Sequence, residues 1–362
     1  MSGPTWRRET GSLDRRTESD LAGYATSSDK ISQIHLLHRE HGGQNVIDAR
    51  KDKSSPAITK YVVDSITGKD KSDFLKTIQF DKLKPYIEAA RSHMLLQHNQ
   101  GISLSTVDEI EDPNSEFFRV YCEDYNTVGM IGPEHTGEED DPDVDLGRTR
   151  NTHMGMTRSL GGSRKDSTGG GNFGLGKQRL WAHSKLGVVF IYSCLSEPYR
   201  GHNKRLIGIN LLPCDPAIEG IIYTAHSYFG FEESHSNSKG TQANYTCSLY
   251  DQEADDFARK LGFNLRSDDE HGTSVLITGF SSREPESKSA LKSIRDELIK
   301  SADWWCWPAI LRGQLQVSAE IRGGDTRNCN PRSRSELEQF IKLYDSNESD
   351  DEEDDINRIP PH

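Results

Sequence analysis

A glycine-dense turn leads directly into a predicted helix at residues 166–182, which read DSTGGGNFGLGKQRLWA. Backbone N–H groups that converge near a helix N-terminus form a natural site for phosphate. The turn fits three nucleotide-binding patterns at once. These are GxGxxG through Gly169, Gly171 and Gly174, most of a Walker A loop through Gly171, Gly176 and Lys177, and GxxGxG through Gly171, Gly174 and Gly176.

The residues around this turn help to decide among the three patterns. A dinucleotide fingerprint and a Walker A loop both follow directly after a buried strand, whereas residues 151–168 are polar and glycine-rich. A Walker A loop also needs Ser or Thr after its lysine to hold Mg²⁺, and this chain has Gln178. The GxxGxG pattern is therefore favoured, with a glycine loop that binds no ligand as the alternative.

Three further segments carry polar and glycine residues where predicted elements begin or end. Residues 44–49 read QNVIDA on a predicted helix, and residues 123–130 read EDYNTVGM at the end of a predicted strand. Residues 272–275 read GTSV at the start of another strand. Each motif is weak by itself, but the order of the four segments along the chain is informative.

This succession resembles the GHKL ATPase superfamily of gyrase, heat-shock chaperones, histidine kinases and MutL. The wording of the motifs resembles the MutL- and MORC-like ATPases encoded beside bacterial restriction and phage-defence genes, over residues 30–320. The resemblance implies an α/β fold of the Bergerat type, an α+β two-layer sandwich with helices on one face of a mixed sheet and a long ATP lid. It implies ATP and Mg²⁺ as cofactors, contacted by Asn45, Asp48, Asp124, Gly129, Met130, Gly171, Gly174, Leu175, Gly176, Lys177 and Thr273.

Elementary chemistry supports several of these roles. The side-chain oxygen of Asn45 suits Mg²⁺, a hard ion that prefers oxygen ligands. Asp124 can accept a hydrogen bond from the adenine amino group in a mostly apolar pocket, and Thr273 can add a hydroxyl at the same edge. Gly129 lets the backbone approach the base, and Lys177 can meet the phosphates as a mobile charge. A surface asparagine, a capping aspartate, a turn and a solvated lysine are the plain alternatives.

The catalytic group departs from the family pattern. The family's glutamate stands four residues before the Mg²⁺ asparagine, where this chain has His41, and Glu40 lies one residue further back. Gly42 and Gly43 weaken a helix by up to about 1 kcal/mol each, so a local bulge could bring Glu40 into place. Alternatively His41 acts as the base, or hydrolysis is lost and ATP acts only as a switch.

Two other departures concern a turn and the length of the chain. Asn126 stands where the family's DxGxG motif has its first glycine, and asparagine tolerates a left-handed backbone better than most residues. The MutL-like branch follows its ATPase domain with a transducer domain, and only residues 285–344 could begin one here. The chain could therefore be a fragment or a minimal version completed by a partner.

The elements that must position these motifs follow from periodicity. Helices are predicted over 30–52 (interrupted by glycines), 81–98, 176–186 and 288–302, and strands over 117–124, 188–195, 206–212, 274–280 and 314–321. Residues 131–170 carry few core residues, and an irregular insertion of this length is usually functional. The expected parts are a disordered arm (1–28), an ATP-binding domain (29–284, with its lid at about 131–176), a transducer-like segment (285–344) and a disordered acidic tail (345–362).

Composition limits the class of protein. The net charge of −13 argues against a surface that binds nucleic acid throughout, although much of it lies in the acidic run at 345–355. Six cysteines without metal-ligand spacing fit reduced thiols. No apolar run approaches the roughly 18 residues of a membrane span, and the N-terminus lacks the apolar core of a signal peptide. We therefore expect a cytoplasmic protein without membrane contact.

The expected function is Mg²⁺-dependent ATP binding with slow hydrolysis that drives lid closure. Closure would reorganise a homodimer or recruit effector proteins, and the resemblance implies effectors such as nucleases acting on foreign DNA, with direct DNA contact left open. A non-hydrolysing ATP-sensing module and a protein kinase of the same fold are the alternatives. A P-loop NTPase is the rival at the level of the fold.

Overall fold

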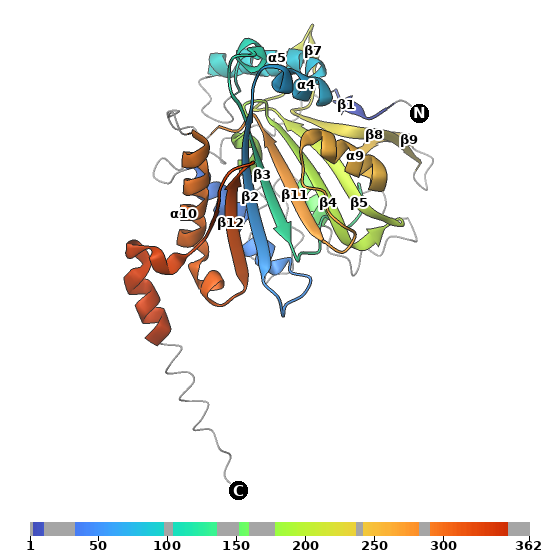
Figure 1. Cartoon of the computed structure of the whole chain (residues 1–362). Helices are drawn as coiled ribbons and strands as arrows, with labels where there is room; N and C mark the ends of the chain where they lie inside the picture. The colour runs from blue at the N-terminus through green and yellow to red at the C-terminus, as the bar shows by residue number, and fades with distance from the viewer. Residues whose placement is uncertain are drawn as a thin grey trace.

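The computed structural model describes residues 3–10, 33–97, 104–135, 152–158, 178–236, 242–281 and 290–346. A large twisted sheet runs through this part of the chain, and helices pack against it (Figure 1). Eleven strands of the described residues belong to the sheet, in the order β1-β8-β5-β4-β11-β3-β2-β12-β13, with β9 paired to β8 and β10 paired to β5. The coarse expectation of a mixed α/β chain with a large mixed sheet is confirmed.

The strands are mostly antiparallel. Their bounds are β1 Thr5–Arg7, β2 Ala57–Ile66, β3 Phe117–Tyr125, β4 Val188–Tyr199, β5 His202–Leu211, β8 His226–Ser236, β9 Gln242–Cys247, β10 Leu249–Tyr250, β11 Gly272–Thr278, β12 Leu315–Ile321 and β13 Thr326–Asn328. A separate hairpin joins β6 Ala217–Ile218 to β7 Ile221–Ile222. Among the described strands only β2 and β12 pair in parallel. Every residue of β11 is buried, as expected for a strand covered on both faces.

The helices are α2 Gln33–His41, α3 Gln44–Asp48, α4 Gly68–Thr77, α5 Lys84–Gln97, α6 Val107–Glu111, α7 Thr152–Thr157, α8 Gln178–Ala182, α9 Asp251–Leu261 and α10 Ala290–Leu311. The helices predicted over 81–98 and 288–302 are confirmed as α5 and α10, the latter longer than expected. The strands predicted from periodicity are also present. Four long elements were not predicted, namely β2, α4, β8 and α9.

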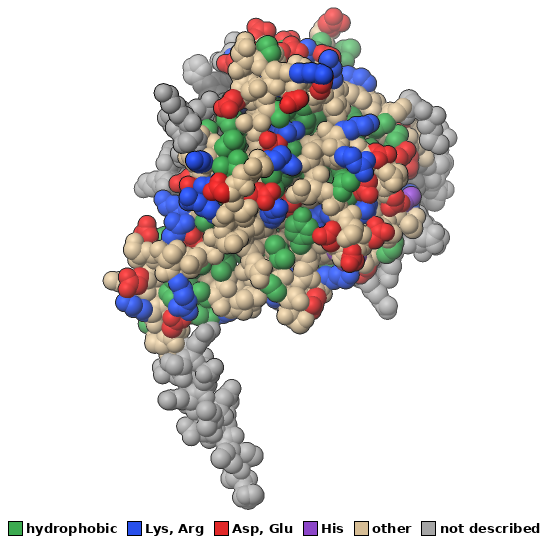
Figure 2. Space-filling model, in the orientation of Figure 1, with side chains coloured by type: hydrophobic (Ala, Val, Ile, Leu, Met, Phe, Trp, Pro, Cys, Tyr) green, Lys and Arg blue, Asp and Glu red, His purple; other side chains and the backbone are tan. Residues whose placement is uncertain are grey.

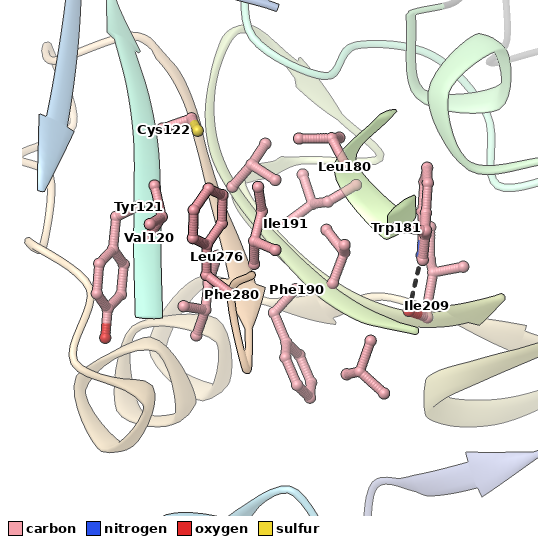
Figure 3. Packing of buried hydrophobic residues seen from close by; sticks show 14 of the residues in the cluster. Val120, Tyr121, Cys122, Leu180, Trp181, Phe190, Ile191, Ile209, Leu276 and Phe280 are labelled. Atoms are coloured by element: carbon pink, nitrogen blue, oxygen red, sulfur yellow. Dashed lines mark hydrogen bonds between the residues drawn. The ribbon is translucent and has the colours of Figure 1, made fainter. Parts of the chain in front are cut away.

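Helices cover both faces of the sheet, which corrects the expectation that they cover one. Successive side chains of a strand point to opposite faces, and on β4 Ile191 lies on the side of α8 while Phe190 lies on the other (Figure 3). On that other side the ring of Phe257 in α9 lies 6.0 Å from the ring of Phe190. The hydroxyl of Tyr192 also donates to Asp255 of α9, at 2.5 Å. Figure 1 shows α9 in front of β4 and β5.

Residues 290–346 continue the same sheet. Strand β12 pairs with β2, with Leu315 opposite Ala57, and α10 lies beside it (Figure 1). The Ser301 hydroxyl of α10 donates to the carbonyl of His35 in α2, at 3.2 Å. The expected boundary between residues 284 and 285 therefore separates no structural units.

The first described residues also belong to the fold, so the expected arm at 1–28 is corrected for residues 3–10. Strand β1 pairs with β8 at one edge of the sheet. Trp6 is buried against the rings of Phe190 and Phe229, and its indole nitrogen donates to the carbonyl of Ile78 at 2.6 Å. A three-residue strand between polar neighbours gives too little periodicity to be predicted.

Two further properties concern the surface and the membrane. Among the helices that the structure describes, none combines the length and apolar character needed to cross a bilayer. On the face seen in Figure 2, acidic and basic side chains are interspersed among hydrophobic ones. The described part of this face therefore has no continuous basic surface of the kind that binds a nucleic-acid backbone.

Candidate functional site

A row of polar side chains crosses five neighbouring strands on the face that carries α2 and α8. Cross-strand register places Thr59 of β2 opposite Asp124 of β3, Thr273 of β11 opposite Ser193 of β4, and Ser193 opposite Arg205 of β5. The backbone N–H of Thr273 donates to Asp124 Oδ1 at 2.9 Å. This hydrogen bond joins the polar residues of β2 and β3 to those of β11, β4 and β5. Two predicted site residues, Asp124 and Thr273, therefore meet at adjoining strand ends.

Hydrogen bonds fix the Asp124 carboxylate through one of its two oxygens, Oδ1. Besides the Thr273 N–H, the hydroxyl of Thr127 donates to Oδ1, so within the described residues both hydrogen bonds to this carboxylate reach the same oxygen. Burial raises the pKa of Asp124, while Arg266 and these two hydrogen bonds oppose the shift. The arrangement presents a second carboxylate oxygen that can accept from a ligand.

Arg266 joins the end of β3 to the start of β11. Its Nη2 donates to the Asp124 carbonyl at 2.7 Å and to Ser274 Oγ at 2.9 Å. Its guanidinium lies 4.1 Å from the centre of the Tyr125 ring. Gly272 allows this approach, since a Cβ there would lie 2.2 Å from the Asp124 carbonyl oxygen. Sequence reasoning missed Arg266, because an arginine in a polar loop carries no pattern.

The turn after β3 has a left-handed backbone at Asn126. Asn126 has a φ of +58°. Its side-chain amide donates to the carbonyl oxygens of Asp52, Ser55 and Pro56 at 3.0, 3.2 and 3.1 Å. Asn126 therefore adopts the left-handed backbone that asparagine tolerates, and its side chain also fixes the loop before β2.

Gly129 and Met130 lie against β4. Gly129 has a φ of +76°, and a Cβ there would lie 2.5 Å from the Cys194 carbonyl oxygen, so the position requires glycine. The backbone N–H of the buried Met130 donates to Ser193 Oγ at 2.9 Å. The Gly129 carbonyl accepts from the Thr152 hydroxyl of α7 at 2.9 Å. These contacts fix the backbone close to Asp124 and Thr273.

Helix α3, which carries Asn45 and Asp48, is attached to the same turn. The backbone N–H of Val128 donates to the Ala49 carbonyl at 2.9 Å, and the N–H of Lys51 donates to the Asn126 carbonyl at 2.9 Å. Asn45 is exposed and Asp48 is half-buried. The segments at 44–49, 123–130 and 272–275 therefore lie together.

The predicted catalytic positions are separated from Asn45 by a break in the helix. Helix α2 ends at His41, and α3 begins at Gln44. Gly42 at this break has a steric requirement, since a Cβ there would lie 2.1 Å from the Tyr61 hydroxyl oxygen. Because the two helices are separate, continuous helical spacing from Asn45 back to His41 or Glu40 does not apply, which corrects the expectation of a shared helix over 30–52. His41 is half-buried, and the Glu40 side chain lies outside the described residues.

The glycine loop also lies outside the described residues, including the expected contacts Gly171, Gly174, Leu175, Gly176 and Lys177. The expected lid is described only at 131–135 and 152–158. There Glu134 and His153 are buried, with His153 Nε2 3.0 Å from Glu134 Oε2. These described parts of the expected lid are therefore packed against the rest of the fold.

The sheet disfavours the two rival loop patterns. Dinucleotide folds, like the βαβ unit in general, join parallel strands through a crossover helix. Strand β4, which follows α8, pairs antiparallel with both β5 and β11. Among the described strands the parallel pair β2–β12 is remote in sequence from the glycine loop.

Comparisons with known proteins add little. No family model matches the chain, and no curated protein matches it. One similar solved structure is the N-terminal domain of a DNA repair protein, at 8% identity and a TM-score of 0.28. The match covers 86% of this chain and 54% of that chain, so this chain spans about half of its length. A TM-score of this size does not establish a common fold.

Proposed function

We propose that this site binds ATP with Mg²⁺ in a Bergerat-type pocket. The observation that carries the proposal is the joining of Asp124 to Thr273 at adjoining strand ends, beside a turn whose Gly129 lets the backbone pack closely against β4. A half-buried carboxylate oxygen that can accept a hydrogen bond selects a base edge with a donor such as the adenine amino group.

Asn45 is the proposed Mg²⁺ ligand. It is exposed on α3, and hydrogen bonds through Ala49 and Lys51 hold that helix to the turn at 126–128. An amide oxygen suits a cation that keeps most of its water and binds phosphate oxygens. Bound Mg²⁺ would neutralise phosphate charge, while α3 holds the amide at the pocket. Lys177 and the glycine loop are proposed to contact the phosphates.

We propose that hydrolysis is slow. Glu40 or His41 would activate the water, and both precede the break at Gly42–Gly43 rather than sharing a helix with Asn45. This break also favours the second candidate, an ATP-sensing module that does not hydrolyse. In either case binding would close the lid and change a contact with a second copy or with an effector such as a nuclease. The face seen in Figure 2 has interspersed charges and offers DNA no continuous basic surface, so a protein partner is proposed for that face.

Titration of the full chain with ATP and Mg²⁺ tests the proposal, with phosphate release followed on the same samples. We expect saturable binding that Mg²⁺ strengthens, and slow release that Asn45→Ala reduces. Binding without release above the Asn45→Ala background would favour the sensing module. Absence of nucleotide binding by the folded wild-type protein would overturn both.

A further inference from the structure

Two buried polar residues that no motif contains lie directly below the turn at 129–132. Ser193 on β4 and Arg205 on β5 are cross-strand partners, and they are 0% and 1% exposed. Burying a guanidinium and a hydroxyl in a sheet costs free energy unless they are hydrogen-bonded. Their contacts are directed at the segment that borders the proposed pocket.

Ser193 joins the turn to β11. Its Oγ accepts from the Met130 N–H at 2.9 Å and donates to the Gly272 carbonyl at 2.9 Å. It also lies 3.3 Å from Thr273 Oγ1. A single hydroxyl thereby ties two chain segments that are far apart in sequence and that together border the pocket.

Arg205 holds the next residues of the same segment. Its Nη1 donates to the carbonyl oxygens of Met130 and Gly132, at 3.1 and 2.9 Å. Its guanidinium lies 4.5 Å from the centre of the Tyr199 ring, and Nη2 lies 3.8 Å from a carboxylate oxygen of Glu134. Because the guanidinium is planar and its donors have a fixed geometry, it sets the spacing of the two carbonyls more rigidly than a lysine would.

We propose that Ser193 and Arg205 are positioning residues that determine base selectivity at the nucleotide site. They fix the backbone at 129–132 relative to β11, and so fix the width of the pocket in which Asp124 meets the base. Selective hydrogen bonding requires placement to within about 0.5 Å, so a turn that drifts would accept other bases nearly as well. This inference rests on the proposed function.

The test compares the nucleotide affinities of full-length variants. Displacement of a fluorescent ATP analogue gives the affinities for ATP, GTP and tripolyphosphate in the presence of Mg²⁺. We expect Ser193→Ala to weaken ATP binding about five- to thirty-fold, the equivalent of about 1–2 kcal/mol. Tripolyphosphate, which lacks a base, should change less than about two-fold, and the preference for ATP over GTP should fall by the factor lost for ATP.

Ser248→Ala is the matched control. Ser248 is also fully buried, and its hydroxyl has no hydrogen-bond partner among the described residues, so its removal should leave all three affinities unchanged. Arg205→Lys is the second variant, and it should also lower the preference for ATP over GTP because it keeps the charge but loses the paired donors. If Ser193→Ala does not fold, the measurements on Arg205→Lys test the proposal instead.

Three outcomes would overturn the proposal. Unchanged ATP affinity in folded Ser193→Ala and Arg205→Lys would show that the pair does not position the pocket. An equal loss for ATP, GTP and tripolyphosphate would show a general structural role. Absence of nucleotide binding by the wild-type protein would remove the proposed function itself, which distinguishes that failure from the first two.

Discussion

Asp124→Asn exchanges one carboxylate oxygen for an amide nitrogen of nearly the same shape. The amide oxygen can still accept from the Thr273 N–H and the Thr127 hydroxyl, which both reach Oδ1. The nitrogen then occupies the Oδ2 position and can only donate. The substitution should therefore keep the strand ends together while reversing the hydrogen bond offered to a base.

The size of the effect follows from this reversal. A hydrogen bond to a charged group contributes about 1.5–3 kcal/mol, so loss of the contact to an adenine amino group should weaken ATP binding about 10- to 150-fold. The free energy of unfolding should respond in the opposite sense, with Asp124→Asn more stable than wild type at neutral pH although it binds ATP more weakly. The pKa of Asp124 is raised by burial above its ordinary 3.8, so the folded protein binds more protons than the unfolded chain between these two values. Wild-type stability should therefore fall as pH rises through that window.

Isothermal titration with ATP and urea unfolding at several pH values measure the two effects. Because asparagine does not titrate, Asp124→Asn should gain stability relative to wild type as pH rises above 3.8, and the two should converge at lower pH. ATP affinity equal to that of wild type, in a variant with wild-type unfolding, would refute the assignment of Asp124 to base recognition.

The remaining predictions concern stability and are measured by urea unfolding. Gly272→Ala places a Cβ 2.2 Å from the Asp124 carbonyl oxygen and should lower the free energy of unfolding by more than about 2 kcal/mol. Gly313→Ala, with a positive φ but open space, should lower it by about 1 kcal/mol. Equal losses would contradict the steric argument. Trp6→Ala should cost about 3–5 kcal/mol, because the indole fills a fully packed site, and a cost below about 1 kcal/mol would show that β1 is dispensable. Burial lowers the pKa of His38 to about 3, so wild-type stability should fall by up to about 1.4 kcal/mol per pH unit as pH drops below 6.5. His38→Gln should remove that part of the slope, and an unchanged slope would show that His38 is not buried in its neutral form.

Local patterns predicted much of the fold. The periodicity of α5 and α10 and the apolar strands β3, β4, β5 and β11 were visible in the sequence, and glycines marked the break between α2 and α3. Strand β2 was missed, although Val62 and Val63 are buried, because lysine and aspartate interrupt its apolar run. Helix α9 was missed because its residues are mostly charged and only one narrow face is buried.

Site residues that stand in sequence motifs could be predicted. Site residues that come together only through the register of the strands could not. Asp124, Gly129 and Thr273 stand in motifs, and the structure brings them together. Ser193 and Arg205 share a row with them only because of how β11, β4 and β5 align. A single sequence does not encode that alignment in any local pattern. Side-chain type alone gave no reason to select one buried serine among several.

The pairing of β2 with β12 joins residues that are far apart along the chain, since Ala57 lies opposite Leu315. Contacts of such long range slow folding, because the intervening chain must be brought together first. Until β12 arrives, β2 is an open edge of ten residues that can recruit a strand from another molecule. A nascent or truncated chain that lacks residues 290–346 should therefore tend to aggregate, and expression of the proposed nucleotide site in isolation would need these residues.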